Sequence, residues 1–212
     1  ELPVLLNNHQ PIEIINHTET LNLNKLERDN SLSVNYEQAW NVTLYTFCVE
    51  YCKRNWVDQM KRIIIGITGA TGTIYGWRLM EMLRNEGDTE IHLVMSQSAK
   101  LTLKMEHDVS IDYINSLAPE VHQPGNIGAS ISSGSFHSAG MIIAPCSIKT
   151  MSNIAMGNTG DLISRAADVI LKERRRLIVA IRETPLHAGH LENLIKLANL
   201  GAVIFPPVPA FY

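Results

Sequence analysis

The sequence predicts an α/β fold, a doubly wound and mostly parallel sheet with helices on both faces. From residue 62 onward, short apolar segments typical of buried strands alternate with longer segments of helical period. The first apolar segment leads into glycines at positions 66, 69 and 72, and an amphipathic segment follows them. Strands that alternate with helices are typical of βαβ units, whose strands are parallel.

Local signals place each element in order. Arg62–Thr68 is apolar and rich in isoleucine, which favours a buried strand, and apolar residues of helical spacing predict a helix over Thr73–Asn85. Gly201 is typical of a helix C-terminus, and Pro119–Ser135, rich in glycine and serine, is expected to be a loop. The other expected strands are Ile91–Met95, Gly140–Ala144, Leu177–Ile181 and Ala202–Phe205, and the other expected helices are Ser98–Lys104, Ile111–Ser116, one from Ser147, Asp161–Glu173 and His187–Leu200.

The glycine-rich turn between the first strand and its helix indicates an anion-binding site. Its spacing is Gly66-x-x-Gly69-x-x-Gly72. Glycines let backbone N–H groups approach a phosphate, and the helix dipole favours negative charge. The spacing differs from the dinucleotide fingerprint, so the motif predicts a phosphorylated cofactor without saying which one. A sharp βα turn without a ligand is the alternative.

The residues that follow the other strands carry further candidates. Ser96 follows the second strand where NAD enzymes usually have Asp or Glu, which counts against NAD. Ser147 and Thr150 lie three residues apart at a helix start, where both hydroxyls can meet one anion, although an ordinary serine N-cap is the alternative. Arg182 and Glu183 form either a structural ion pair, or a phosphate-binding cation beside a proton donor.

Composition excludes several classes of protein. The net charge of −3 gives no electrostatic case for nucleic acid or an anionic membrane as the main partner. No apolar run approaches the roughly 20 residues that span a bilayer. Three cysteines do not make a disulfide framework, and we expect a cytoplasmic location. Cys146 is interpreted as a buried thiol, and Cys48 and Cys52, without further ligands nearby, are not expected to bind a metal.

The first 59 residues differ from the rest of the chain. They are rich in Asn, Thr and Glu and contain no glycine, and Met60 stands directly before the first strand. We therefore interpret residues 1–59 as an N-terminal extension of unknown role, either disordered or upstream of the true start. Residues 60–212 are expected to form the functional domain. The chain stops at Tyr212 within a predicted loop, which suggests a C-terminal truncation.

A family resemblance covers residues 60–212 almost continuously. The chain resembles the UbiX-type flavin prenyltransferases, formerly described as aromatic-acid or polyprenyl-hydroxybenzoate decarboxylases. The segments that carry the resemblance, in order and spacing, are GITGATGTIYGWRL, HLVMSQSA, SISSGSF, APCSIKT, RAADVILKERRRL, RETPLH and GAVIFPPVPAFY.

The resemblance implies a fold, a reaction and partners. Such enzymes are flavodoxin-like or Rossmann-like flavoproteins and form homo-oligomers, typically dodecamers. They join a dimethylallyl group from dimethylallyl monophosphate to N5 and C6 of reduced FMN, without a metal. The prenylated FMN serves a separate decarboxylase of the UbiD type, in quinone synthesis or aromatic-acid breakdown.

The resemblance also implies roles for individual residues. Glu183 and Glu106 would handle protons, and Lys172 and Tyr212 would hold the prenyl phosphate. Arg165 matches a further family position near the ligands. Residues expected to contact FMN are Gly69, Ala70, Thr71, Ser96, Ser147, Ile148, Lys149, Thr150 and Arg182, with Thr71 also counted as catalytic.

Two departures from the family pattern accompany the resemblance. Thr71 stands where the family usually has serine, which keeps the hydroxyl and adds a methyl group. The chain also lacks the C-terminal residues that carry a further basic phosphate ligand, so it is expected to bind FMN and to catalyse poorly.

Three alternatives stay open at this point. A flavin-dependent cysteine decarboxylase of the same fold would need a PxMN-type motif, which is absent from the sequence. An NAD(P)-binding module like the short-chain dehydrogenases would need a Tyr-x-x-x-Lys pair and an acid after the second strand. A non-catalytic flavin-binding protein is the third alternative, favoured only by the truncation.

Overall fold

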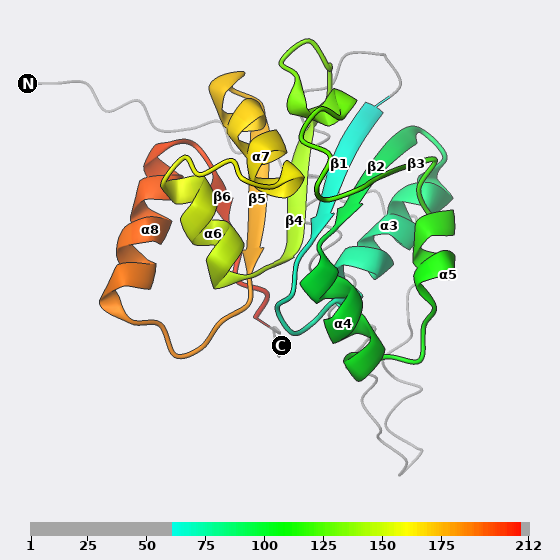
Figure 1. The fold of residues 1–212 in the computed structure, drawn as a ribbon, viewed down its shortest axis with the longest axis horizontal. Coiled ribbons are helices and arrows are strands. Elements are labelled where there is room, and N and C mark those ends of the chain that lie inside the picture. The colour runs from blue at the N-terminus through cyan, green and yellow to red at the C-terminus, as the bar shows by residue number, and fades with distance from the viewer. Residues whose placement is uncertain (1–60, 209–212) are drawn as a thin grey trace, which may run out of the picture. The chain divides into compact units, whose positions relative to one another are not determined.

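The computed structural model describes residues 61–208, which contain a six-stranded parallel sheet (Figure 1). The strand order is β3-β2-β1-β4-β5-β6, the order of Rossmann-type sheets. The doubly wound fold predicted from the sequence is therefore confirmed. The strands are β1 (Lys61–Ile67), β2 (Thr89–Met95), β3 (Glu120–His122), β4 (Gly140–Cys146), β5 (Arg176–Ile181) and β6 (Val203–Ile204), and the helices are α3 (Ile74–Glu86), α4 (Gln97–Glu106), α5 (Ile111–Ser116), α6 (Ile148–Ala155), α7 (Leu162–Lys172) and α8 (Ala188–Asn199), with a 3₁₀ turn at Ser130–Ser132.

The central strand β1 pairs in parallel with β2 on one side and β4 on the other. Ile63 lies opposite Ile91 of β2 and opposite Gly140 of β4. Because all the strands run the same way, the segments that leave their carboxyl ends gather at one edge of the sheet. This edge lies at the lower end of the sheet in Figure 1.

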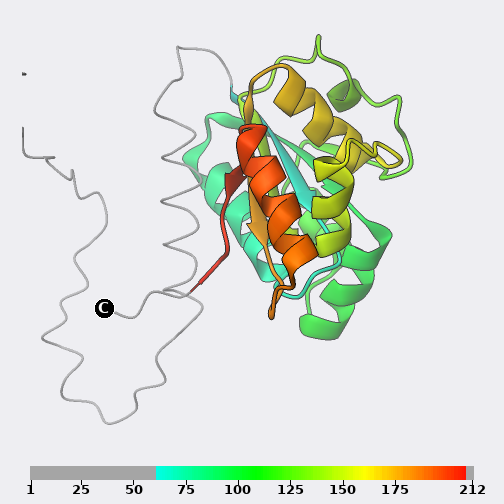
Figure 2. The same ribbon diagram turned by 90° about the vertical axis from the view of Figure 1, so that its left-hand side faces the viewer.

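Alternate side chains of β1 enter two separate cores. Ile63, Ile65 and Ile67 pack with residues of α3, α4 and α5, whereas Ile64 packs with residues of α6 and α7. Figure 2 shows α6 between α7 and α8 on this second face, and α6 contacts both of them. A strand buried on both faces needs apolar residues at every position, which explains the unbroken isoleucine run.

The prediction of a loop over Pro119–Ser135 was wrong at one point, because this segment contains the edge strand β3. The strand has only three residues and pairs only with β2. Side chains reinforce the pairing, since the rings of His92 and His122 stack and their nitrogens lie 3.0 Å apart. So short a segment, with exposed Glu120 and Val121, gives no periodic signal in the sequence.

Several predictions lie outside the described residues. They concern the extension 1–59, Met60, the pair Cys48 and Cys52, and Tyr212. Within residues 61–208, no helix has both the length and the apolar character needed to cross a membrane.

Gly76 lets helix α3 approach the sheet closely. A Cβ atom at this position would lie 2.3 Å from the Ala144 carbonyl oxygen and 2.8 Å from the Ile67 side chain. Backbone on one side and a buried isoleucine on the other leave no room for a methyl group. This contact fixes α3 beside the carboxyl ends of β1 and β4.

We expect Gly76→Ala to lower the free energy of unfolding by about 1–3 kcal/mol, because overpacking outweighs the better helix propensity of alanine. Urea denaturation of the whole chain measures the change. Gly125→Ala is the matched control, because nothing lies within 4 Å of a Cβ there. Equal midpoints for the two variants would contradict the close approach.

Candidate functional site

The candidate site lies where β1, β2, β4 and β5 end. Backbone hydrogen bonds tie these ends together: Ser96 N–H donates to the Ile67 carbonyl at 3.0 Å, and Arg182 N–H donates to the Cys146 carbonyl at 3.2 Å. The segments that follow these strands carry most of the predicted cofactor residues. In open α/β sheets, ligands bind outside the carboxyl ends of the strands.

The N–H groups of the glycine turn after β1 are hydrogen-bonded to a side-chain carboxylate of the same chain. The Glu106 carboxylate accepts hydrogen bonds from Gly72 N–H (2.7 Å), Thr73 N–H (2.9 Å) and the Thr73 hydroxyl (2.8 Å). Thr73, the N-cap of α3, makes no side-chain cap hydrogen bond of its own. A carboxylate from the end of α4 therefore caps α3 and compensates the positive end of its dipole.

This contact occupies two of the donors that the sequence offered to a phosphate at the start of α3. The N–H groups of Gly72 and Thr73 are already used by Glu106, whose side chain is 19% exposed. The two preceding residues differ, since Thr71 is exposed and the N–H groups of Ala70 and Thr71 bond no described residue. The outer part of the turn therefore remains available to a ligand.

The conformation of the turn depends on its glycines. A Cβ at Gly69 would lie 2.4 Å from Cβ of Ser98, so the turn approaches the start of α4 too closely for any side chain. Gly72 has φ +89° and rests on the Tyr75 ring, 2.6 Å from the position of a Cβ. Both positions therefore need glycine for a structural reason.

Tyr75 connects the glycine turn with Arg182. The Tyr75 side chain is 8% exposed, and its hydroxyl interacts with the Arg182 guanidinium. Burial raises the pKa of the Tyr75 hydroxyl, and the adjacent Arg182 cation partly opposes this rise. Arg182 leaves the end of β5 and lies exposed, so the contact directs its cation toward the turn after β1.

A second turn, between β4 and α6, is built around Ser147. The Ser147 hydroxyl caps α6, with the Thr150 N–H donating to it at 3.4 Å and the two hydroxyl oxygens 3.2 Å apart. Ser147 is therefore the N-cap of α6, the role given above as the alternative to anion binding. Lys149, in the first turn of α6, is exposed. A helix N-terminus with nearby hydroxyls and an exposed cation suits a phosphate.

Ser96 caps α4 in the same way, accepting from the Ala99 N–H at 3.0 Å. Among the described residues, no ion pair joins Arg182 and Glu183, and the Glu183 carboxylate accepts from the Thr184 N–H at 3.2 Å. Glu183 is exposed at the site. Its carboxylate is therefore accessible for chemistry.

The buried-thiol interpretation of Cys146 is confirmed. Cys146 is 0% exposed, and burial raises the pKa of its thiol far above the usual range. Such a thiol is a poor nucleophile. Among residues 61–208, no group of three or more His, Cys, Asp or Glu side chains could hold a metal ion.

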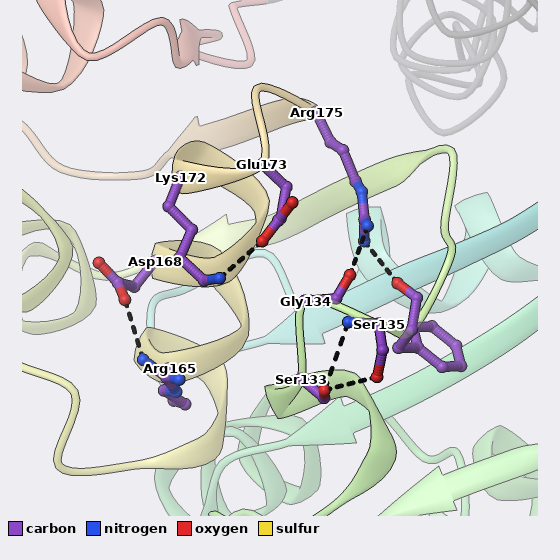
Figure 3. Close-up of polar contacts among 9 residues, drawn as sticks. Ser133, Gly134, Ser135, Arg165, Asp168, Lys172, Glu173 and Arg175 are labelled. Carbon is purple, nitrogen blue, oxygen red and sulfur yellow. Dashed lines mark hydrogen bonds and ion pairs between the residues drawn. The ribbon is translucent and has the colours of Figure 1, made fainter.

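Lys172 lies away from this edge, and Arg165 stands seven positions before it on the same helix. Lys172 ends α7, ahead of the start of β5, whereas Arg182 and Glu183 follow the end of that strand. Figure 3 shows Lys172 bonded to Glu173 at 2.6 Å and Arg165 bonded to Asp168 at 3.1 Å. One chain does not bring these two cations to Arg182 and Glu183.

A loop at that opposite edge is held by a third cation. Arg175 donates to the carbonyl oxygens of Gly134 (2.8 Å) and Phe136 (2.5 Å) (Figure 3). The residues around Gly134 lie beside Lys172, whose Nζ is 2.9 Å from the position of a Cβ at Gly134. The loop 133–136 and the end of α7 therefore form one surface.

Sequence reasoning missed two residues that organise the site, Thr68 and Tyr75. Both are buried polar side chains, with Thr68 1% exposed. Thr68 directly precedes Gly69 of the motif, whereas Tyr75 stands three positions after Gly72. A hydroxyl beside Gly69 was the available signal for Thr68, but its partners lie on a distant segment.

We expect Glu106→Ala to lower the free energy of unfolding by about 1.5–3 kcal/mol, because two backbone donors at the start of α3 lose a charged acceptor. Chemical denaturation measures the change. Glu106→Gln keeps one acceptor oxygen and should lose less, and Glu192→Ala, an exposed carboxylate of α8, is the control. If Glu106→Ala unfolded at the midpoint of Glu192→Ala, Glu106 would not cap α3.

Comparison with known proteins agrees with this geometry. The family model described as "Flavoprotein" matches residues 53–211. The chain is 57% identical over 153 residues to the flavin prenyltransferase UbiX of Escherichia coli K12, an alignment that covers 72% of this chain and 81% of the relative.

Solved structures give the same result. The crystal structure of AnUbiX (PadA1) in complex with FMN and dimethylallyl pyrophosphate matches with a TM-score of 0.71 and 49% identity, covering 73% of this chain and 81% of that one. A dodecameric FMN-dependent UbiX-like decarboxylase from Escherichia coli O157:H7 matches with a TM-score of 0.70 and 46% identity, covering 71% of this chain and 82% of that one.

The alternatives of a cysteine decarboxylase and an NAD(P)-binding module are not favoured. This chain belongs to the flavoprotein family and, within it, to the UbiX-type flavin prenyltransferases.

Proposed function

We propose that this chain transfers a dimethylallyl group from dimethylallyl monophosphate to reduced FMN, and that the product serves a UbiD-type decarboxylase. The identity to curated flavin prenyltransferases is the observation that carries the proposal. The solved relative with FMN and dimethylallyl pyrophosphate supports both ligand classes. We further propose that residues 60–212 form the catalytic domain, that 1–59 have no part in catalysis, and that the enzyme acts in the cytoplasm.

The residues at the carboxyl edge fit FMN. The N-terminus of α6, with Ser147, Ile148, Thr150 and the exposed Lys149, suits the single phosphate. The start of α3 is closed to it by Glu106. The residues assigned to the rest of FMN are Gly69, Ala70, Thr71, Ser96 and Arg182.

Bound FMN would supply N5 and C6, the two atoms that accept the prenyl group. Cleavage of the allylic C–O bond builds negative charge on the departing phosphate, so a proton donor there lowers the barrier. We assign this role to Glu183, which is exposed at the end of β5. The exposed Thr71 hydroxyl can hydrogen-bond the substrate. We assign Glu106 a proton-handling role because the family resemblance implies one.

The prenyl phosphate is proposed to need residues from a second copy of the chain. The six residues of β5 span about 17 Å at about 3.3 Å per residue. Lys172 precedes this strand and Glu183 follows it, so one chain cannot place both on one phosphate. The dodecameric relative supports an oligomer, in which Lys172 and Arg165 of one copy would face Glu183 of another. Tyr212 is assigned to the same phosphate.

The first prediction concerns the cofactor. The turn at Ser147 combines a helix N-terminus, two hydroxyls and the exposed Lys149, which suits a single phosphate, so we expect FMN and not FAD. Mass spectrometry of the small molecule released from the purified protein identifies it. Release of FAD or NAD would contradict the proposed function.

A second prediction concerns the shared site. We expect Glu183→Gln to slow prenyl transfer about 100-fold or more, with FMN affinity unchanged, because the group acts on developing charge. Lys172→Met should also be slow. In oligomers assembled from equal amounts of both variants, about a quarter of the sites would combine an intact Lys172 with an intact Glu183.

Activity that returns on mixing would support a site built by two copies. If the mixture were no more active than the single variants, Lys172 and Glu183 would have to act within one chain. Offering dimethylallyl monophosphate and dimethylallyl pyrophosphate in parallel identifies the preferred donor. A Glu183→Gln variant that turned over normally would remove that residue from the mechanism.

A further inference from the structure

We propose that Thr68 is a positioning residue for the FMN phosphate, acting through the turn at Ser147. Thr68 is the residue directly after β1, and its side chain is 1% exposed. It touches no ligand position itself. The inference rests on the proposed function, because it assumes that the phosphate binds at the N-terminus of α6.

The Thr68 hydroxyl joins two strands at their ends. It donates to the Pro145 carbonyl oxygen at 2.8 Å and accepts from the Ser147 N–H at 2.7 Å. The Thr68 backbone N–H also donates to the Pro145 carbonyl, at 3.2 Å. Three hydrogen bonds that involve Thr68 therefore hold the end of β4 against the end of β1.

These bonds determine what the turn presents to a ligand. Because its own N–H is held by Thr68, Ser147 keeps φ −77° and ψ 155°, the extended conformation of an N-cap. Its hydroxyl then reaches Thr150, and the chain enters α6 directly. The N–H groups that follow Ser147 are thereby preorganised for an anion. Thr68 also immediately precedes Gly69, so the same residue sets the distance between the two cofactor turns.

The Thr68 hydroxyl, and not the shape of the side chain, makes these hydrogen bonds. Valine has nearly the shape of threonine and fills the same buried space, but it can neither donate to Pro145 nor accept from Ser147. With valine, the Ser147 N–H loses its acceptor, and the turn is no longer held in place by this hydrogen bond. Serine keeps the hydroxyl and both bonds. The pair of substitutions therefore separates the hydrogen bonds from the packing.

The test compares FMN with riboflavin, which lacks the phosphate, by fluorescence titration of the intact chain. We expect Thr68→Val to weaken FMN binding about tenfold or more and to leave riboflavin binding nearly unchanged, so that the preference for FMN falls. Thr68→Ser should restore the preference to within about threefold. Ser164→Ala is the matched control, because it removes another buried hydroxyl, bonded to Asp161 at 3.0 Å, on α7.

The outcomes are distinguishable from a failure of the proposed function. If the parent chain did not prefer FMN over riboflavin, the phosphate site itself would be wrong. If the parent preferred FMN and Thr68→Val kept that preference, only the role of Thr68 would be overturned. An equal loss for both flavins would also overturn it, because this would indicate general destabilisation.

Amide hydrogen exchange on the parent chain gives a second measurement, which does not depend on the folding of a variant. The Ser147 N–H should be protected before FMN is added, because the Thr68 hydroxyl already accepts from it. Rapid exchange of this N–H in the flavin-free chain, with protection appearing only on FMN binding, would overturn the proposal.

Discussion

Parallel pairing of β1 with β2 on one side and β4 on the other is the constraint on which the site depends. It brings the turns after these strands to one edge, although Gly69 and Ser147 lie 78 positions apart in the sequence. The chain winds outward in both directions from β1, and in open α/β sheets ligands bind at the point where the strand order reverses. The backbone bonds of Ser96 to Ile67 and of Arg182 to Cys146 extend the same alignment to four strands.

At this edge the helices α3 and α6 differ in which group accepts hydrogen bonds from their first N–H groups. The start of α3 is neutralised from within, by the Glu106 carboxylate. The start of α6 is capped only by the small hydroxyl of Ser147, with exposed Lys149 beside it. Two open helix starts would suit a ligand with two phosphate groups. Closing one of them with an internal carboxylate favours a mononucleotide such as FMN over a dinucleotide.

Much of the fold could be predicted from the sequence, because its signals are local. The isoleucine run of β1, the glycine after α8 and the serine before α6 each determine their own element. The short strand β3 could not be predicted, because its three residues depend on the partner strand and on the stacking of His92 and His122. An edge strand of this length has no period of its own.

The strand ends that carry the candidate site could be predicted, but the contacts of its residues could not. The glycine turn was predicted to bind a phosphorylated cofactor, and in the folded chain its Gly72 N–H donates to a carboxylate 34 positions away. No spacing rule connects Gly72 with Glu106, because the contact depends on where α4 ends after β2 has returned through the sheet. The same reason hid Thr68 and Tyr75, whose hydroxyls reach segments that pair only in the folded chain.

The distance between Lys172 and Glu183 carries the argument from the single chain to the assembly. Helix α7 runs back along the sheet, so its last residue must lie near the start of β5 and far from the end of that strand. Nothing in one chain can shorten this distance, because β5 is held rigidly between β4 and β6. Lys172, at the end of α7, nevertheless lies beside the loop 133–136, which Arg175 holds by two hydrogen bonds to its carbonyl oxygens. If a neighbouring copy of the chain places its carboxyl edge against this surface, Lys172 of one copy lies near Glu183 of the other. A complete catalytic site would then form only in the oligomer.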